Sequence, residues 1–509
     1  MKREDTRKAQ PTMNRIHEIL SNGAPRAVAI EDHDGTAFTY ADLTALVEEM
    51  AGTLGRYGIG PGDRVMLLSE NCVTYLVAVL ALSRLDAWTL LVNARLTQAE
   101  VSRLADVADV CCAIFTPEAS PAARAHAERM DAVSLGTLPC GDVLVSPLRE
   151  AIAEPVEPGP QQVAVLIYTS GTVGEPKGVM LTHGNLLFMS GVAADLRRIS
   201  PADTMLAILP GTHILGLTSI FLSTLTSGGK VIALPRFSPD EVLRHIREGV
   251  TLIPAVPQIF AALLRRLREL GEDAPEHKLR FIYAGGAPLD LALKREVERV
   301  FRIPLHNGYG LTEASPGVAN TRIDSPRDDA SVGLAIPGAE VIIHDPDEHG
   351  VGELRVRGPN VMKGYYRNPE ATRAALTEDG FLRTGDLARQ DPDGALFVVG
   401  RLKELIVRSG FNIYPPEVEA VLNDHPAVTM SAVVGMLRDG NEDVIGFVTV
   451  HDPVTEDALR AWAQERLAAY KVPARIVIAD ALPQAATGKI MKNALLEHFR
   501  EQLETRTDR

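Results

Sequence analysis

The sequence predicts an α/β protein, with a large N-terminal domain of helix-covered sheets plus a barrel-like lobe, and a small mobile α+β C-terminal domain. Two observations lead to this prediction. Much of the chain alternates short apolar runs with helical patterns, which is typical of parallel sheets covered by helices. After about residue 330, short strands are divided by Asp, Pro and Gly clusters, which favours a more antiparallel, barrel-like lobe.

The elements follow in order along the chain. Strand-like runs at 64–69 (RVMLLS), 229–234 (GKVIAL) and 279–286 (LRFIYAGG) each precede a helical pattern. The lobe contributes the strands AEVIIHD, GELRVRG and ALFVVG. From about residue 404 the pattern changes to helix PPEVEAVLNDH, strands SAVVGM and VIGFVTV, and helix EDALRAWAQERL. We therefore expect a large domain over 1–400, a hinge at 401–403 and a small domain over 404–509.

Composition excludes several classes of protein. The 509 residues are 46% hydrophobic and 23% charged, which is ordinary for a globular protein. A net charge of −14 argues against a nucleic-acid partner, which would require a basic face. The four cysteines have neither zinc spacing nor a disulfide framework, so we expect buried thiols in a reducing compartment.

Neither a secretory signal nor a membrane span is expected. The first twenty residues lack a continuous apolar region. The most apolar stretch, 74–92, contains Arg84 and Asp86 near its middle, so a short helix followed by a buried strand is the better interpretation. We expect a soluble, cytoplasmic protein.

Three glycine-bearing segments each follow a predicted strand. They are YTSGTVGEPKG (168–178), AGGAP (284–288) and GYGLTEASP (308–316). Ligands of open α/β sheets bind beyond the carboxyl ends of strands, so three such loops from one sheet are expected to converge on one ligand. The alternative is that they are unrelated turns, since glycine after a strand is common.

The first segment has the chemistry of a phosphate-binding loop, although Lys177 lies between Pro176 and Gly178 and not in a Gly-Lys-Ser/Thr triplet. Hydroxyl groups, glycines that expose backbone N–H groups, and one ammonium group suit a polyphosphate such as that of ATP. The residues concerned are Thr169, Ser170, Gly171, Thr172, Gly174 and Lys177.

Glu313 lies within the third segment, just after GYGLT, where an acidic side chain would repel phosphate unless a cation lay between them. We expect it to bind Mg²⁺. The alternative is a helix-capping role with Thr312 or Ser315.

Four motifs resemble the ordered core motifs of the adenylate-forming superfamily, which includes acyl- and aryl-CoA synthetases. They are YTSGTVGEPKG, GYGLTEASP, TGDLARQDPDGALFVVGRLKELIVRSGFNIYPPEVE and LPQAATGKI. The resemblance covers nearly the whole chain, from residue 36 to residue 490, and is nearest to fatty acyl- and coumarate-type CoA ligases. One departure is Val173, where the family usually has threonine; we expect little consequence, because neighbouring hydroxyl and N–H groups remain.

The resemblance implies two half-reactions, with ATP, Mg²⁺ and CoA required. A carboxylate attacks the α-phosphorus of ATP and releases pyrophosphate, and a thiol, usually that of CoA, then displaces AMP. The chain's contribution is mostly positioning and charge neutralisation. Lys489, Glu313, Thr169 and His213 are the expected catalytic residues, and Lys489 would hold the substrate carboxylate and the α-phosphate together during adenylation.

The resemblance also assigns nucleotide and thiol contacts. Asp386 would accept hydrogen bonds from both ribose hydroxyls, although a lone Asp after Gly is more often a turn residue. Lys403 matches the hinge of a domain rotation that follows adenylation, with a solvated charge as its alternative. The other expected contacts are Gly285, Gly286 and Ala287 beside adenine, Tyr309 stacked on it, Gly308, Gly310 and Thr312 in the same motif, Arg401 at ribose or phosphate, and Gly410 along the thiol tunnel.

The acid itself is expected to have an uncharged tail, fatty or aromatic. His213 matches the gate of the acyl site, with an ordinary buried histidine as the alternative. Ile214, Leu217 and Ile220 around it are apolar, and no aspartate lies between Leu209 and Leu225 to bind an ammonium group. The expected partners are this acid and CoA. In the alternative interpretation, an acyl-AMP ligase loads the phosphopantetheine thiol of a carrier protein.

Overall fold

A computed structural model of the chain describes residues 13–169, 176–273, 275–408, 411–438, 441–484 and 490–504. Internal contacts divide the chain into two compact units. The large unit contains the residues up to Glu340 together with Arg357–Leu382, and the small unit contains Val341–Val356 and the residues from Arg383 onward. The hinge expected at 401–403 stays a prediction.

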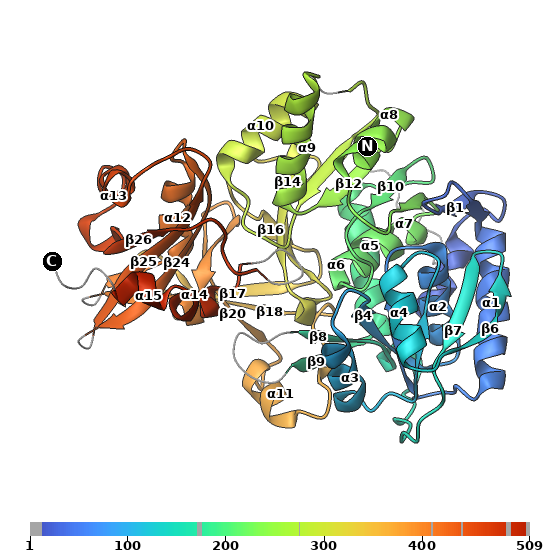
Figure 1. Cartoon of the computed structure of the whole chain (residues 1–509). Helices are drawn as coiled ribbons and strands as arrows, with labels where there is room; N and C mark the ends of the chain where they lie inside the picture. Colours follow the sequence, from blue (N-terminus) through green and yellow to red (C-terminus); the bar gives the residue numbers. More distant parts are fainter. Residues whose placement is uncertain are drawn as a thin grey trace, which may run out of the picture. The chain divides into compact units, whose positions relative to one another are not determined.

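The large unit contains two sheets that have mainly parallel centres (Figure 1). Within the described residues, the first has nine strands. In spatial order they are β16 (Leu334–Ala335), β15 (Gly317–Asn320), β14 (Leu305–Gly310), β13 (Phe281–Ala284), β12 (Leu252–Ala255), β10 (Thr204–Ala207), β11 (Lys230–Ala233), β1 (Val28–Glu31) and β2 (Ala37–Thr39). Strands β14 through β1 in this order are parallel, as the alternation of apolar runs and helices predicts.

The second sheet has eight strands over the same described ranges. In order they are β19 (Gly364–Tyr365), β9 (Lys177–Thr182), β8 (Val163–Thr169), β4 (Trp88–Asn93), β3 (Arg64–Ser69), β5 (Cys112–Phe115), β7 (Gly141–Val145) and β6 (Val133–Leu138). The central four are parallel, whereas β8 and β9 form an antiparallel hairpin. Strand β3 is buried along its whole length, as expected of a strand covered on both faces.

Helices connect these strands. The main ones are α1 (Tyr40–Tyr57), α2 (Val73–Arg84), α3 (Gln98–Val107), α4 (Pro121–Arg129), α5 (His183–Arg197), α8 (Pro239–Glu248), α9 (Pro257–Leu270), α10 (Leu291–Phe301) and α11 (Pro369–Ala375). Shorter segments are η1 (Ile16–Asn22), η2 (Gly159–Gln161), α6 (Ile214–Gly216), the π-helical η3 (Leu217–Leu222), α7 (Ser223–Thr226) and η4 (Thr312–Ala314).

The structure of the stretch 74–92 confirms the predicted short helix followed by a buried strand. It folds as the buried helix α2 followed by the buried strand β4. Among the described residues, no helix is long and apolar enough to cross a bilayer. Cys72, Cys111 and Cys112 are buried thiols, but Cys140 is only partly buried.

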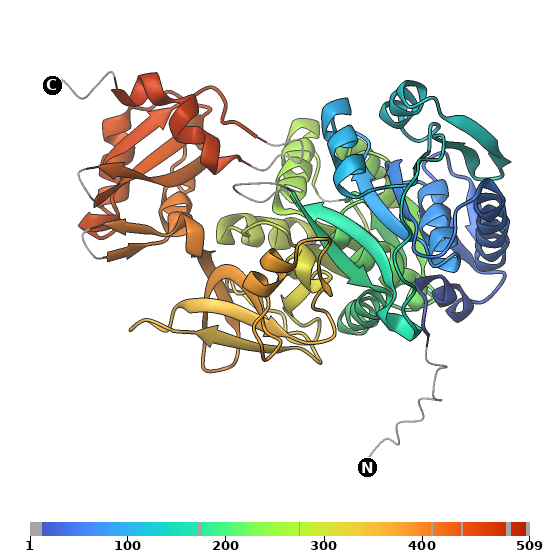
Figure 2. The same cartoon turned by 90° about the horizontal axis from the view of Figure 1, so that it is seen from below.

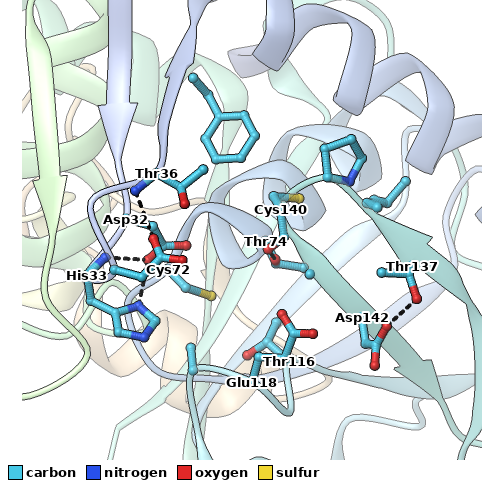
Figure 3. A pocket seen from close by; sticks show the side chains of 16 residues that line it. Asp32, His33, Thr36, Cys72, Thr74, Thr116, Glu118, Thr137, Cys140 and Asp142 are labelled. Carbon is cyan, nitrogen blue, oxygen red and sulfur yellow. Dashed lines mark hydrogen bonds and ion pairs between the residues drawn. The ribbon is translucent and has the colours of Figure 1, made fainter.

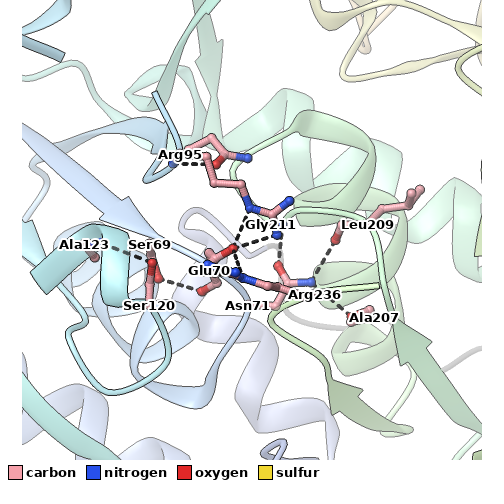
Figure 4. Close-up of polar contacts among 11 residues, drawn as sticks. Ser69, Glu70, Asn71, Arg95, Ser120, Ala123, Ala207, Leu209, Gly211 and Arg236 are labelled. Atoms are coloured by element: carbon pink, nitrogen blue, oxygen red, sulfur yellow. Dashed lines mark hydrogen bonds and ion pairs between the residues drawn. The ribbon is translucent and has the colours of Figure 1, made fainter. Parts of the chain in front are cut away.

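A polar network joins the two sheets of the large unit where β3 and β10 end (Figure 4). The carboxylate of Glu70, with only 3% of its side chain exposed, accepts from Arg95 at 2.7 Å and from Arg236 at 3.2 Å. The amide of Asn71 donates to the carbonyls of Ala207 and Leu209 at 3.0 and 2.9 Å. Because buried polar groups require partners, this network fixes the carboxyl end of one sheet beside that of the other.

The small unit contains an antiparallel region and an α+β region (Figure 2). The first is a four-stranded sheet among the residues described. Its order is β17 (Glu340–His344), β18 (Gly352–Arg357), β20 (Leu382–Gln390) and β21 (Leu396–Arg401). The second contains η5 (Leu402–Glu404), β22 (Ile406–Arg408), β23 (Phe411–Ile413), α12 (Pro415–Asn423), β24 (Val428–Arg438), β25 (Asn441–Val450), α13 (Glu456–Gln464), η6 (Ala469–Lys471), β26 (Arg475–Ile478), α14 (Lys492–His498) and α15 (Arg500–Glu504).

Side-chain alternation gives the β24–β25–β26 sheet two cores. Val433 packs with Leu422 of α12 and Leu459 of α13 on one face. On the other face, the adjacent Ala432 packs with Leu495 of α14. Successive strand residues point to opposite faces, so a sheet covered by helices on both sides requires apolar residues at consecutive positions.

Candidate active site

The phosphate-type loop joins two strands of an antiparallel hairpin. Thr169 ends β8, Lys177 begins β9, and the two residues face each other across the ladder. The loop therefore differs from a P-loop, which leads from a strand into a helix. Ser170, Gly171, Thr172 and Gly174 lie outside the described residues.

Lys177 contacts an aromatic ring. Its ammonium lies 5.1 Å from the ring centroid of Tyr365. No carboxylate of the described part of the chain forms an ion pair with it. A cation held over a ring face remains available to an incoming anion.

The second glycine segment begins at the end of β13, and the third begins within the last three residues of its neighbour β14. Gly285 is buried, Gly286 is exposed with φ at +78°, and Ala287 is partly buried. A Cβ on Gly285 would lie 2.6 Å from the Tyr283 ring, and one on Gly308 would lie 2.5 Å from the Tyr283 hydroxyl oxygen. Tyr283 packs directly against the backbone of Gly285, after β13, and of Gly308, within β14, so a side chain at either position would displace it.

Strand β14 carries the rest of the third segment. Tyr309 and Gly310 at its end are half-buried, and Thr312 in η4 is buried. Because β14 and β13 are parallel neighbours, their carboxyl ends place both segments at one sheet edge.

The prediction that all three loops come from one sheet is wrong. The first loop follows β8 of the eight-stranded sheet, whereas the others follow β13 and β14 of the nine-stranded sheet. A buried apolar run has the same pattern in either sheet, so the sequence pattern does not show which neighbours a strand pairs with.

Glu313 lies on the short turn η4 and is half-buried. Its Oε1 accepts a hydrogen bond from the Tyr365 hydroxyl at 2.9 Å. Burial, and then the charge of Glu313, raise the pKa of Tyr365, so this hydroxyl keeps its proton and donates. The side chain of Glu313 thus bonds to Tyr365 and not to Thr312 or Ser315, which was the capping alternative.

The surroundings of Glu313 fit one kind of metal site. No group of three or more His, Cys, Asp or Glu side chains able to hold a metal occurs among the described residues. Mg²⁺ commonly binds through one or two carboxylates, with water and substrate phosphate completing its shell. A single carboxylate near a phosphate-type loop is therefore a suitable donor set for Mg²⁺ bound together with a nucleotide.

His213 precedes α6, and its Nδ1 accepts from the Leu215 backbone N–H at 3.3 Å. The residue is in contact with solvent, yet the protein packed around its ring lowers its pKa through desolvation. The apolar residues that follow lie in the helical segments α6 and η3 and are fully buried: Ile214, Leu217, Ile220 and Phe221.

Asp386 and Arg401 form a pair in the small unit. They face each other across β20 and β21, and Arg401 Nε lies 3.0 Å from Asp386 Oδ1. Asp386 is 4% exposed and lies within a strand, so the turn alternative does not hold. Lys403 is exposed on the turn η5. Gly410 and Lys489 lie outside the described residues.

Sequence reasoning missed Tyr365 as a site residue. The sequence feature that could have indicated it is the pair of adjacent tyrosines in GYYRNP, and the sequence does not show which strand this segment pairs with. The contact with Glu313, which lies 52 positions earlier, arises only from the fold.

A separate cavity of about 220 Å³ lies near β1, α2 and the β6–β7 hairpin (Figure 3). Several of its polar groups already have local partners. Asp32 accepts from the Val73 N–H at 3.2 Å, and the Thr74 hydroxyl donates to the Cys140 carbonyl. This cavity contains none of the predicted site residues.

Comparison with known proteins identifies the family. The family model for AMP-binding enzymes matches residues 20–366, and that for the AMP-binding enzyme C-terminal domain matches residues 417–489. A feruloyl-CoA synthase from Amycolatopsis sp is 37% identical over 94% of this chain and 96% of its own length. The long-chain-fatty-acid–CoA ligase FadD13 of Mycobacterium tuberculosis is 34% identical over the same shares.

Solved structures agree with this assignment. ATP-bound MatB from Rhodopseudomonas palustris has a TM-score of 0.83 at 30% identity, covering 96% of this chain and 99% of that one. The o-succinylbenzoate CoA synthetase MenE from Bacillus subtilis, in complex with ATP and a magnesium ion, has a TM-score of 0.80 at 31% identity, with the same coverage. The fold is that of an adenylate-forming ligase. The chain belongs to the AMP-binding enzyme family, as an acyl-CoA synthetase.

Proposed function

We propose that this ligase activates a carboxylic acid with an apolar tail, fatty or aromatic, and transfers it to CoA. The acid's carboxylate oxygen attacks the α-phosphorus of ATP, the bond to the bridging oxygen breaks, and pyrophosphate leaves. The CoA sulfur then attacks the carbonyl carbon of the acyl-adenylate, loses its proton and displaces AMP.

The observation that carries this proposal is the arrangement of Lys177, Tyr365 and Glu313. A cation without a carboxylate partner among the described residues contacts the ring of one tyrosine, and a lone carboxylate accepts from the hydroxyl of the same tyrosine, beside a hairpin loop rich in hydroxyl groups. Lys177 would bind the departing phosphates, and Glu313 would hold Mg²⁺. Bound there, Mg²⁺ would neutralise charge on the phosphate oxygens.

The small unit supplies the nucleotide contact in this proposal. Asp386 would accept from the ribose hydroxyls while Arg401 holds its carboxylate in place. Lys489, Gly410 and a hinge at Lys403 keep the roles that the superfamily resemblance implies. The domain boundaries 1–400 and 404–509 belong to this same proposal.

The apolar tail is supported by the residues after His213. The side chains there are uncharged and apolar, and a pocket built from them would select the acid by size at about 1–3 kcal/mol per methylene. The relatives named for ferulate and for long-chain fatty acids fall within this class.

The test is pyrophosphate release with ATP, Mg²⁺ and a panel of straight-chain, branched and aromatic acids, each with and without CoA, with products identified by mass spectrometry. Thioester from one acid class is the expected result. Adenylate without thioester would instead indicate a carrier-protein thiol as acceptor. Amino acids as the sole active substrates would overturn the apolar class.

A further inference from the structure

Tyr365 connects the two charged groups on which the proposed chemistry depends. Its hydroxyl donates to Glu313 Oε1 at 2.9 Å, while its ring lies 5.1 Å from the Lys177 ammonium. One side chain thus contacts both the expected metal ligand and the expected phosphate ligand. Tyr365 itself is 9% exposed, so its position is set by packing.

The backbone around Tyr365 joins the two loops. Strand β19 pairs antiparallel with β9, placing Tyr365 opposite Val179, two residues after Lys177. Just before β19, the Met362 N–H donates to the carbonyl of Glu313 at 2.8 Å. Residues 362–366 therefore bridge the hairpin of the eight-stranded sheet and the Glu313 turn of the nine-stranded sheet.

The carboxylate of Glu313 has little else to orient it. Within the described chain, Tyr365 is its sole side-chain donor, and no Lys, Arg or His forms an ion pair with it. A carboxylate on a short turn would otherwise sample several rotamers, and ordering it during metal binding would cost free energy. A hydrogen bond to one oxygen fixes the plane of the group and leaves the second oxygen for a cation.

We propose that Tyr365 is a positioning residue with two separable roles: its hydroxyl orients Glu313 for Mg²⁺, and its ring holds Lys177 beside the phosphate loop until nucleotide arrives. This inference rests on the proposed function. Because the hydroxyl and the ring act on different partners, two substitutions separate them. Tyr365→Phe removes only the hydroxyl, and Tyr365→Leu removes both.

The adjacent Tyr366 provides a matched control. Its hydroxyl also donates to a carboxylate, Glu154 Oε1, at 2.8 Å, and its ring packs edge-on against Trp88. These partners differ from those of Tyr365, so Tyr366→Phe removes the same kind of hydrogen bond without touching the one to Glu313.

The experiment measures Mn²⁺ binding by electron paramagnetic resonance in the presence of α,β-methylene ATP, which cannot release pyrophosphate. We expect Tyr365→Phe to weaken Mn²⁺ binding about tenfold, the size expected for a lost hydrogen bond to a charged group. Tyr366→Phe should bind as the wild type does. In turnover, Tyr365→Phe should need about tenfold more Mg²⁺ and recover most of its rate at saturating metal, whereas Tyr365→Leu should also raise the KM for ATP.

One outcome would overturn the positioning role of Tyr365, and a different outcome would overturn the proposed function. If the wild type binds Mn²⁺ with the analogue and releases pyrophosphate, but Tyr365→Phe matches Tyr366→Phe, the positioning role is wrong and the proposed function stands. If the wild type neither binds the metal with nucleotide nor releases pyrophosphate with any acid, the proposed function itself is wrong. Thermal unfolding of each variant identifies any that fail to fold.

Discussion

At the scale of single residues, Asp386 shows how an ion pair between neighbouring strands fixes the position of a side chain. The side chain is buried beside Arg401, on facing positions of two strands. A carboxylate paired with arginine has a fixed orientation, which would suit two neighbouring ribose hydroxyls.

Asp386→Ala should therefore raise the KM for ATP at least about tenfold, since hydrogen bonds to a charged group contribute about 1.5–3 kcal/mol. Steady-state kinetics at varied ATP measure this. Glu417→Ala is the control, because Glu417 pairs with Lys471 at 2.6 Å on an exposed part of the same unit. An unchanged KM in Asp386→Ala would remove Asp386 from the nucleotide site.

Loss of Lys489 should slow pyrophosphate release more than loss of Lys177 does. Lys489→Ala should lower pyrophosphate release by about 10²–10³, as loss of a preorganised charge at the reacting atoms does. Lys177→Ala should cost less, because hydroxyl and backbone donors of the same loop share the phosphate. Matched pyrophosphate assays on both variants decide the order, and a larger loss in Lys177→Ala would reverse it.

At the scale of elements, the first turn of α5 carries a buried titratable group. His183, the first residue of the helix, has no exposed surface, and its Nδ1 accepts from the Ile16 N–H at 3.3 Å. Burial, then the charges of Arg15 and His17, lower its pKa to about 3. A histidine with a lowered pKa is neutral when folded, so between about pH 3 and 6.5 the unfolded chain binds the extra proton.

Stability should consequently fall as the pH drops below 6.5. This one histidine should contribute a loss of about 2 kcal/mol between pH 7 and pH 5. Urea unfolding of the wild type and of His183→Asn at both pH values measures it, and the variant should lose less on acidification. His306, whose pKa is lowered to about 4, remains in both proteins. Equal losses in the two proteins would contradict the assignment to His183.

The local sequence pattern predicted which segments are strands and which are helices, but it did not predict which strands pair with each other. The run at 64–69 is the strand β3, and the stretch 74–92 is the helix α2 followed by β4, as expected. The segment after Tyr168 is a hairpin and not a strand-to-helix loop, because Val179 and Leu181 pair back onto β8. A strand can pair antiparallel with the preceding strand only where that strand has a free edge, and a free edge is a property of the assembled sheet.

At the scale of the whole molecule, the proposed reaction requires one chain to perform two chemical steps. Lys403 lies on the exposed turn η5. Proline fixes φ near −65°, which a short helical turn tolerates but a large backbone rotation does not.

Lys403→Pro should therefore form acyl-adenylate at a near-normal rate. Thioester formation should fall at least about tenfold, because misplaced reacting groups slow a reaction by this much or more. Pyrophosphate release without CoA and thioester yield with CoA measure the two steps. Lys403→Ala removes the charge alone and should preserve both. Loss of both steps in Lys403→Pro would contradict a hinge at this position.

The sequence by itself determined the α/β class and the residue types of the loops, since periodicity and glycine placement are local properties of the chain. Its four motifs carried the resemblance to the superfamily. Only the tertiary structure decided that the loops belong to two sheets, that Glu70 and Asn71 join those sheets, and that Tyr365 links Glu313 with Lys177. These contacts join residues far apart in sequence. Their geometry follows from strand pairing and packing, which no window of local sequence contains.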